Sequence, residues 1–235
     1  MAPSLIVAVV GDFDPTFPTH TATNDALRHA SAELGIEIEV QWQATEPLEQ
    51  DLSAVHAADA LLCAPGSPYR SLNGAVAALR HGREQGVPTL GTCGGFQHMV
   101  IEYARHVLGF EDAQHAEYDP YASDLFVSAL TCSLVGKTMP VSLVAGSRAA
   151  ELYGLTEVEE QYYCNFGLEP GHRRTLHDGG FRVTGVDGEQ EARVLELPGH
   201  PFYVATLFVP QARSTPEQPH PLLTGLLRAA RQNRG

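Results

Sequence analysis

Short apolar runs separated by polar turns mark the first half of the chain as a series of strands. Continuous apolar runs at Leu5–Val10 and Ala60–Ala64 are typical of strands that are buried on both faces. Ile36–Trp42 alternates apolar and polar residues, which also predicts a strand. Pro88–Gly91 predicts a further short strand, so four strands are expected before residue 92.

Stretches with apolar residues at helical spacing lie between these strands. The first is expected to begin at a cap formed by Thr23 or Asn24 and to end at Gly35. Two more helices are predicted at Asn73–Arg83 and Gly94–Leu108. Because strands and helices alternate, we predict an α/β fold with a doubly wound, mostly parallel sheet and helices on both faces.

The second half of the chain is less regular but continues the same domain. No linker, repeat or low-complexity tract interrupts the sequence, so residues 1–235 are expected to form a single domain. The remaining predicted elements are strands at Phe126–Leu130 and Met139–Leu143, a hairpin formed by Phe181–Val186 and Ala192–Leu197, a last core strand at Val204–Val209, and a helix at Pro221–Gln232.

The net charge and the hydropathy of the chain restrict the kinds of molecule that it can bind. The chain has 15 Lys and Arg residues against 28 Asp and Glu residues, a net charge of −13, which disfavours nucleic acid and anionic membranes as partners. No segment reaches the roughly 18 apolar residues of a membrane span, and the N-terminal apolar run lacks the basic residues of a signal peptide. The four cysteines show no metal-binding spacing, so we expect reduced thiols, no metal, no cofactor and a cytoplasmic location.

Cys93 stands at the centre of a glycine-rich turn between a predicted strand and a predicted helix. The sequence Gly91-Thr92-Cys93-Gly94-Gly95 matches the G-x-nucleophile-x-G elbow, whose glycines permit a strained turn. The helix N-terminus favours a thiolate over a thiol. Backbone N–H groups at Gly94 and Gly66 are predicted to form an oxyanion hole. The other cysteines are expected to fill the core: Cys63, Cys132 and Cys164.

The stretch VPTLGTCGGFQHMVIEYARHVLGFEDAQHAEYDP (87–120) resembles the glutaminase domain of CTP synthase, a class I glutamine amidotransferase. LLCAPGSPYRSLNG stands where that family has its oxyanion loop, and the resemblance extends over nearly the whole chain. It implies a flavodoxin-like fold with Cys93 as nucleophile and Gly66 and Gly94 in the oxyanion hole. It also places Gln97 and Glu117 at positions that bind the glutamine substrate.

The catalytic base and acid of the family are replaced in this chain. In the family motif Q-F-H-P-E-F, the histidine position is occupied by Val209 and the glutamate position by Gln211. An arginine that pairs with the substrate carboxylate is replaced by Gln161. His200 aligns with a different family histidine, so its use as a base would require a shift of the alignment by one strand. Negligible glutaminase activity is expected.

A nucleophilic Cys93 would therefore need another base, and the sequence leaves several alternatives open. His115, two residues before Glu117, is the first candidate, followed by His98 and His20. A thiolate stabilised by the helix N-terminus would need no histidine at all.

Three functions are compatible with these residues. The first is a stand-alone cysteine hydrolase or amidotransferase-like enzyme acting on a C–N bond of a small molecule other than glutamine. The second is a non-catalytic ligand-binding or regulatory protein, which keeps the pocket but not the chemistry. The third and weakest is a glutaminase subunit of a separate synthetase. The expected partner in all three is a small molecule, and a homodimer is left open.

Overall fold

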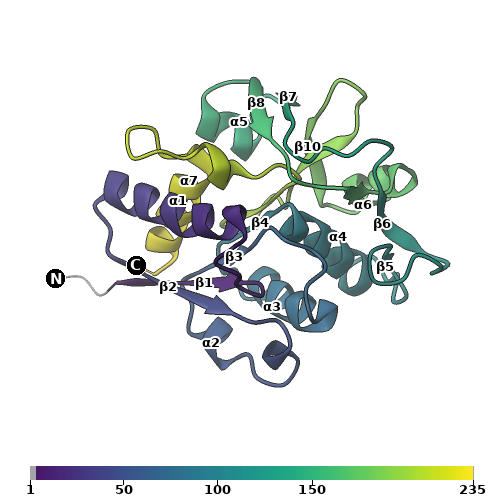
Figure 1. The fold of residues 1–235 in the computed structure, drawn as a ribbon, viewed down its shortest axis with the longest axis horizontal. Coiled ribbons are helices and arrows are strands. Elements are labelled where there is room, and N and C mark those ends of the chain that lie inside the picture. The colour runs from purple at the N-terminus through teal and green to yellow at the C-terminus, as the bar shows by residue number, and fades with distance from the viewer. Residues whose placement is uncertain (1–3, 235) are drawn as a thin grey trace.

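The computed structural model describes residues 4–234, which are built around a nine-stranded sheet (Figure 1). In spatial order its strands are β2 (Ile38–Gln43), β1 (Leu5–Val10), β3 (Ala60–Cys63), β4 (Thr89–Thr92), β12 (Tyr203–Thr206), β11 (Ala192–Glu196), β10 (Arg182–Val186), β7 (Thr138–Leu143) and β8 (Glu157–Gln161). Neighbouring strands are parallel from β2 to β12 and antiparallel from β12 to β8. The predicted α/β class is confirmed, and the sheet is mixed.

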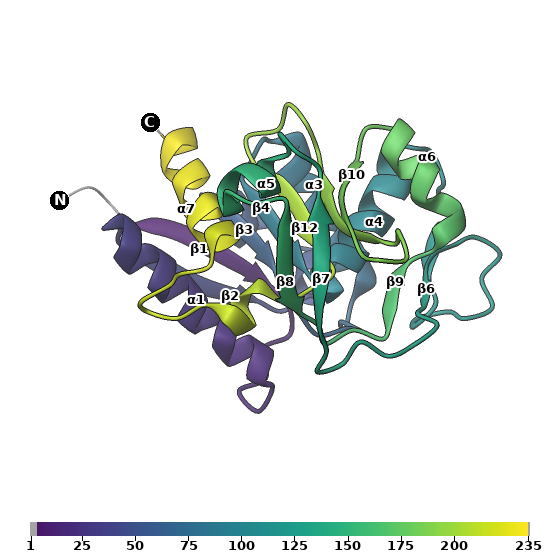
Figure 2. The same cartoon turned by 90° about the horizontal axis from the view of Figure 1, so that it is seen from above.

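Helices cover both faces of this sheet (Figures 1 and 2). On one face α1 (Pro18–Leu34) packs against α7 (Pro221–Arg234), which also contacts α5 (Arg148–Tyr153). On the other face α3 (Leu72–Glu84) packs against α4 (Gly94–His106). Covered on both sides, the central strands β3, β4 and β12 consist of buried residues throughout, which explains why β3 appears in the sequence as an uninterrupted apolar run.

A second, three-stranded sheet with the order β5-β6-β9 packs beside α4. Its strands are β5 (Gln114–His115), β6 (Leu125–Ala129) and β9 (Phe166–Leu168). Short α-helices are α2 (Ser53–His56) and α6 (Arg173–Asp178), and short 3-10 helices are η1 (Pro47–Glu49), η2 (Pro170–His172) and η3 (Pro210–Arg213). Figure 2 shows α6, β9 and β6 together at one end of the molecule.

Two element boundaries differ by three residues or more from the sequence-based expectation. Helix α1 begins at Pro18, five residues before the predicted cap at Thr23, because proline at the first helical position needs no N–H partner. Thr23 instead donates its hydroxyl to the Thr19 carbonyl inside the helix. The last core strand, predicted to reach Val209, ends at Thr206, so the following residues are free to form a loop at the sheet edge.

The parallel strands place their carboxyl ends at one edge of the sheet. The segments that follow β1, β3, β4 and β12 therefore lie close together, as is usual for ligand sites in open α/β sheets. Within residues 4–234, none of the helices is long and apolar enough to span a lipid bilayer.

Candidate active site

Cys93 occupies a strained turn between β4 and α4. Its backbone has φ 51° and ψ −105°, a conformation that residues other than glycine rarely adopt. Its N–H donates to the Thr206 carbonyl across 2.9 Å, which ties the turn to the end of β12. The sequence-based prediction of an elbow at Cys93 matches this geometry.

Close packing explains why glycines surround the cysteine. A Cβ atom at Gly95 would lie 2.2 Å from the Cys63 carbonyl oxygen, and one at Gly91 would lie 2.3 Å from the Met99 sulfur. Distances this short are not tolerated, so α4 and β4 can approach one another only when both positions carry hydrogen. The elbow is thus built by backbone contact.

The backbone N–H groups of Gly66 and Gly94 both hydrogen-bond to the Cys93 sulfur. Gly66, with φ 101°, lies in the loop after β3, which is the loop that the sequence suggested for this role. His20 holds this loop: its Nδ1 accepts the Asp14 N–H, so its Nε2–H donates to the Pro65 carbonyl across 2.9 Å. Two amides from separate loops therefore converge on one sulfur.

The third partner of the Cys93 sulfur is another cysteine. The Cys164 thiol lies with its sulfur 3.0 Å from the Cys93 sulfur and 2.8 Å from the Leu207 carbonyl oxygen. Cys164 lies in the segment between β8 and β9 and is 2% exposed. Both cysteines are free thiols, so the contact is a hydrogen bond and not a disulfide.

These contacts separate the acidities of the two thiols. The hydrogen bond from Cys164 is the largest influence on Cys93 and, with the Gly66 and Gly94 amides, lowers its pKa against the opposing effect of burial. Burial raises the pKa of Cys164 well above its ordinary value, and the adjacent Cys93 adds to that shift. Cys93 is therefore the more acidic thiol of the pair, and Cys164 is the hydrogen-bond donor.

A small cavity of about 60 Å³ opens beside the two sulfurs. It is lined by Phe17, Thr19, Pro65, Gly66, Ser67, Cys93, Glu117, Tyr163, Cys164, Asn165 and Phe166. Burial raises the pKa of Glu117, and its Oε2 atom is buried without a hydrogen-bond partner in the described chain. Since a ligand pocket usually measures about 300–1,000 Å³, this cavity has room only for the reactive end of a molecule.

His115, predicted as the alternative base, has both ring nitrogens engaged elsewhere. Its Nδ1 accepts the N–H of Glu117 across 3.0 Å, so its Nε2–H donates to Gln97 Oε1, also across 3.0 Å. Gln97 passes the link on by donating to the Phe166 carbonyl. Burial lowers the pKa of His115 to about 3. In this structure His115 and Gln97 thus form a hydrogen-bonded pair next to Glu117 and Phe166, two residues that line the cavity.

The ring nitrogens of the other candidate histidines also hydrogen-bond to groups other than Cys93. His98 donates from Nδ1 to the Gly94 carbonyl across 2.7 Å and accepts the Tyr118 hydroxyl at Nε2, and burial lowers its pKa to about 4. His200 precedes β12 and hydrogen-bonds to the Gly82 carbonyl. Cys93 lies at the other end of β12, beside Thr206, so His200 is at the wrong edge of the sheet to serve as base.

Val209 and Gln211, which the sequence analysis aligned with the family's acid–base positions, have structural contacts. Val209 is fully buried, and its N–H donates to the Gln161 carbonyl across 2.8 Å. Gln211 is 2% exposed and donates to the Thr92 hydroxyl across 2.9 Å. The glutamine side chain thus braces the strand that leads into Cys93.

Sequence reasoning missed Cys164 as a site residue and misplaced Cys132. Cys132 was expected in the core but is exposed, whereas Cys63 and Cys164 are buried as expected. The contact between Cys93 and Cys164 joins residues 71 positions apart, and no local pattern marks it. Over residues 4–234, no group of three or more His, Cys, Asp or Glu side chains is arranged to hold a metal ion.

Comparisons with known proteins agree with the fold. The family model "Glutamine amidotransferase class-I" matches residues 19–229. The chain is 37% identical over 238 residues to CTP synthase of Methanopyrus kandleri and 33% identical over 241 residues to CTP synthase of a Cyanothece species. These matches cover 95% and 97% of this chain, but only 44% of each relative. The chain therefore belongs to the class I glutamine amidotransferase family.

Solved structures show the same fold. The glutaminase domain of a Trypanosoma brucei CTP synthase, determined with bound acivicin, has a TM-score of 0.90 at 23% identity and covers 97% of this chain and 94% of its own. A glutamine amidotransferase from Methylobacillus flagellatus has a TM-score of 0.56 at 15% identity, covering 99% of this chain and 90% of its own. The similarity in fold thus extends over the whole domain.

Proposed function

We propose that the chain is a cysteine-nucleophile enzyme that cleaves a carbon–nitrogen bond of a small molecule other than glutamine. The observation that carries this proposal is the convergence of three donors on one sulfur: the Gly66 amide, the Gly94 amide and the Cys164 thiol. Together they lower the pKa of Cys93, so a thiolate forms without a histidine base.

The same two amides serve the reaction after attack. When the Cys93 thiolate adds to an amide carbonyl carbon, the sulfur loses its negative charge and the carbonyl oxygen gains it. The N–H groups of Gly66 and Gly94 then stabilise that oxygen as an oxyanion hole. Collapse breaks the C–N bond, the amine leaves with a proton, and a thioester remains for hydrolysis by water.

Glu117 is the carboxyl group among the cavity's lining residues and is suited to handle the leaving amine. Its raised pKa makes it a readier proton carrier than an ordinary carboxyl group, and its unpartnered Oε2 can accept a hydrogen bond from the amine. A cavity whose lining holds this carboxyl group and neither Arg nor Lys favours a neutral or cationic substrate over a carboxylate. The small volume admits the scissile group alone.

Three amides that differ in size and in the charged groups they carry test this proposal: acetamide, glycinamide and glutamine. We expect ammonia release and a thioester on Cys93, detected by intact mass spectrometry, with the neutral and cationic amides but not with glutamine. Cys93→Ser should abolish both signals, while Cys132→Ser, an exposed cysteine away from the elbow, should leave them unchanged. Binding without turnover by the wild-type chain would favour the non-catalytic alternative instead.

A further inference from the structure

The two thiols at the elbow, Cys93 and Cys164, are close enough for disulfide chemistry, which acyl transfer does not require. A disulfide bond is about 2.05 Å long, and the Cys93 and Cys164 sulfurs are 3.0 Å apart, so a movement of about 1 Å joins them. Cys93 is fixed at the N-terminus of α4, whereas Cys164 lies in the short connection between β8 and β9. The closure therefore needs an adjustment of one connecting segment.

The two cysteines are unequal in the way that a reacting and a resolving thiol are. Cys93 accepts hydrogen bonds from two backbone amides and from Cys164, which stabilises its thiolate. Cys164 stays protonated and faces the Cys93 sulfur directly. Cys63 provides the internal contrast: it is also buried, but its sulfur neighbour is the Tyr69 hydroxyl at 3.5 Å, and burial raises its pKa to about 12.

Access to the pair is restricted by size. Both cysteines line the same cavity of about 60 Å³, a volume equal to about two water molecules in the liquid. Hydrogen peroxide and small alkyl hydroperoxides are of this size, so the cavity has room for them beside the two sulfurs.

We propose that Cys93 and Cys164 form a redox-active dithiol that reduces small hydroperoxides and closes reversibly to a disulfide. The Cys93 thiolate attacks the terminal peroxide oxygen, the O–O bond breaks, and the departing alkoxide takes up a proton. The products are a Cys93 sulfenic acid and an alcohol, or water when the oxidant is hydrogen peroxide.

The second step consumes Cys164. Its thiol, losing its proton, attacks the Cys93 sulfur, and the sulfenic hydroxyl leaves as water while the S–S bond forms. In sum, two thiols and one hydroperoxide give one disulfide, one alcohol and one water. A small dithiol reductant restores both thiols by exchange and is itself oxidised to a disulfide.

Disulfide formation also removes the nucleophile required by the proposed C–N cleavage. Because that step is not needed for peroxide reduction, the redox proposal stands independently of the proposed function. A chain that cleaves no amide but forms the Cys93–Cys164 disulfide would refute the first and support the second.

The test treats the full chain with one equivalent of hydrogen peroxide and maps its cysteines by mass spectrometry without reduction. We expect a loss of two hydrogen masses and a linked peptide pair containing Cys93 and Cys164, both reversed by dithiothreitol. Peroxide consumption should fall about tenfold or more in Cys93→Ser, since an ordinary thiol is only a few per cent ionised at pH 7. Cys132→Ser serves as the control and should keep wild-type consumption.

Substitution of Cys164 should stop the reaction halfway. In Cys164→Ser and Cys164→Ala, Cys93 should still consume peroxide but accumulate as a sulfenic acid that dimedone traps. Two replacements guard against a folding defect in either one, and circular dichroism checks both. Oxidation of Cys132 in place of Cys93, or a wild-type chain in which Cys93 and Cys164 remain unlinked after peroxide treatment, would overturn the proposal.

Discussion

The ring of His115 donates from Nε2 to the Gln97 side-chain oxygen, while its Nδ1 accepts the backbone N–H of Glu117. This arrangement needs the neutral ring, because a protonated Nδ1 could no longer accept. The bond fixes β5 to α4 and sets the start of the segment that carries Glu117 into the cavity. A residue first considered for proton transfer is thereby a positioning residue.

The buried neutral histidines predict acid sensitivity. Burial lowers the pKa of His98 to about 4 and of His115 to about 3 from 6.5. Above pH 6.5 neither state binds these protons, so the two rings cause no pH dependence. As the pH falls from 6.5 towards 4, the two histidines bind protons in the unfolded chain but not in the folded chain, so the free energy of unfolding decreases.

The expected slope is up to about 1.4 kcal/mol per pH unit for each ring in that window. Urea unfolding measured between pH 4 and pH 7 checks it. His115→Gln should lower the slope, whereas His177→Gln, at an exposed position, should not. An identical slope in wild type and His115→Gln would show that His115 takes up its proton in the folded state.

The acidity of Cys93 should depend on Cys164. Loss of the Cys164 donor removes the largest influence that lowers the Cys93 pKa, so Cys164→Ala should raise that pKa. The rate of iodoacetamide labelling at Cys93, followed against pH by peptide mapping, reports the change. Labelling is measured in a Cys132→Ser background because Cys132 is exposed and competes for reagent, whereas Cys93 is only 4% exposed.

Earlier labelling of Cys93 than of the buried Cys63 and Cys164 is expected in that background. If Cys164→Ala leaves the pH profile of Cys93 where it was, the thiol–thiol hydrogen bond has no influence in solution. The dithiol proposal would then lose the asymmetry on which its first step depends.

The glycines of the elbow should be irreplaceable for stability. Gly95→Ala places a methyl group 2.2 Å from the Cys63 carbonyl oxygen, which forces α4 away from β3. We expect a loss of about 3 kcal/mol or more in the free energy of unfolding. Gly171→Ala is the matched control, because its Cβ would meet no atom within 4 Å, and its effect should stay below about 1 kcal/mol. Equal stabilities of the two variants would contradict the packing account.

Glutamine should be a poor substrate. A general base contributes about 10²–10⁴-fold to the rate in acid–base catalysis. Val209 cannot act as a base, because its side chain is buried and apolar and its N–H donates to the Gln161 carbonyl. Ammonia release from glutamine by the purified chain should therefore stay near the level of Cys93→Ser. Rapid release that depends on Cys93 would mean that a base outside the predicted set assists the sulfur.

The elbow could be predicted from the sequence because its requirements are local. Gly91, Gly94 and Gly95 flank Cys93 directly, and the apolar run and helical spacing on either side define the strand and the helix. The hairpin at β10 and β11 was likewise marked by Asp187-Gly188. The partner of Cys93 could not be predicted in this way, because its contact with Cys164 depends on how β9 packs beside α4.

Strand β8 shows a different limit. Its sequence Glu-Val-Glu-Glu-Gln has the composition of a solvated segment, and only its pairing with β7 makes it a strand. The same dependence on tertiary packing applies to His115. Its spacing to Glu117 suggested a role shared by the two residues, but nothing in the sequence indicates that the imidazole hydrogen-bonds to Gln97. Contacts between residues that are far apart in the sequence become visible only in the structure.

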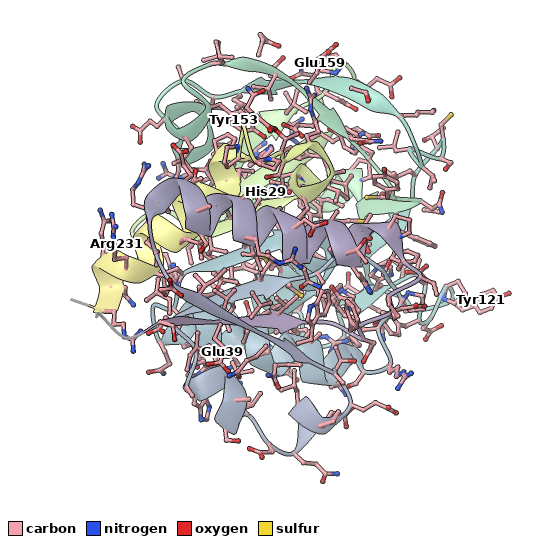
Figure 3. The ribbon with its side chains drawn as sticks, turned by 60° about the vertical axis from the view of Figure 1, so that its left-hand side comes forward. His29, Glu39, Tyr121, Tyr153, Glu159 and Arg231 are labelled. Carbon is pink, nitrogen blue, oxygen red and sulfur yellow. The ribbon has the colours of Figure 1, made fainter. Side chains whose placement is uncertain are left out.

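The nine-stranded sheet ends in β2 on one side and β8 on the other, and each end carries an exposed glutamate, Glu39 and Glu159 (Figure 3). An edge strand has unpaired backbone groups that can template the addition of a strand from another molecule. Two copies meeting edge to edge would bring like charges opposite one another. The charges on β2 and β8 therefore oppose growth of the sheet into an intermolecular array.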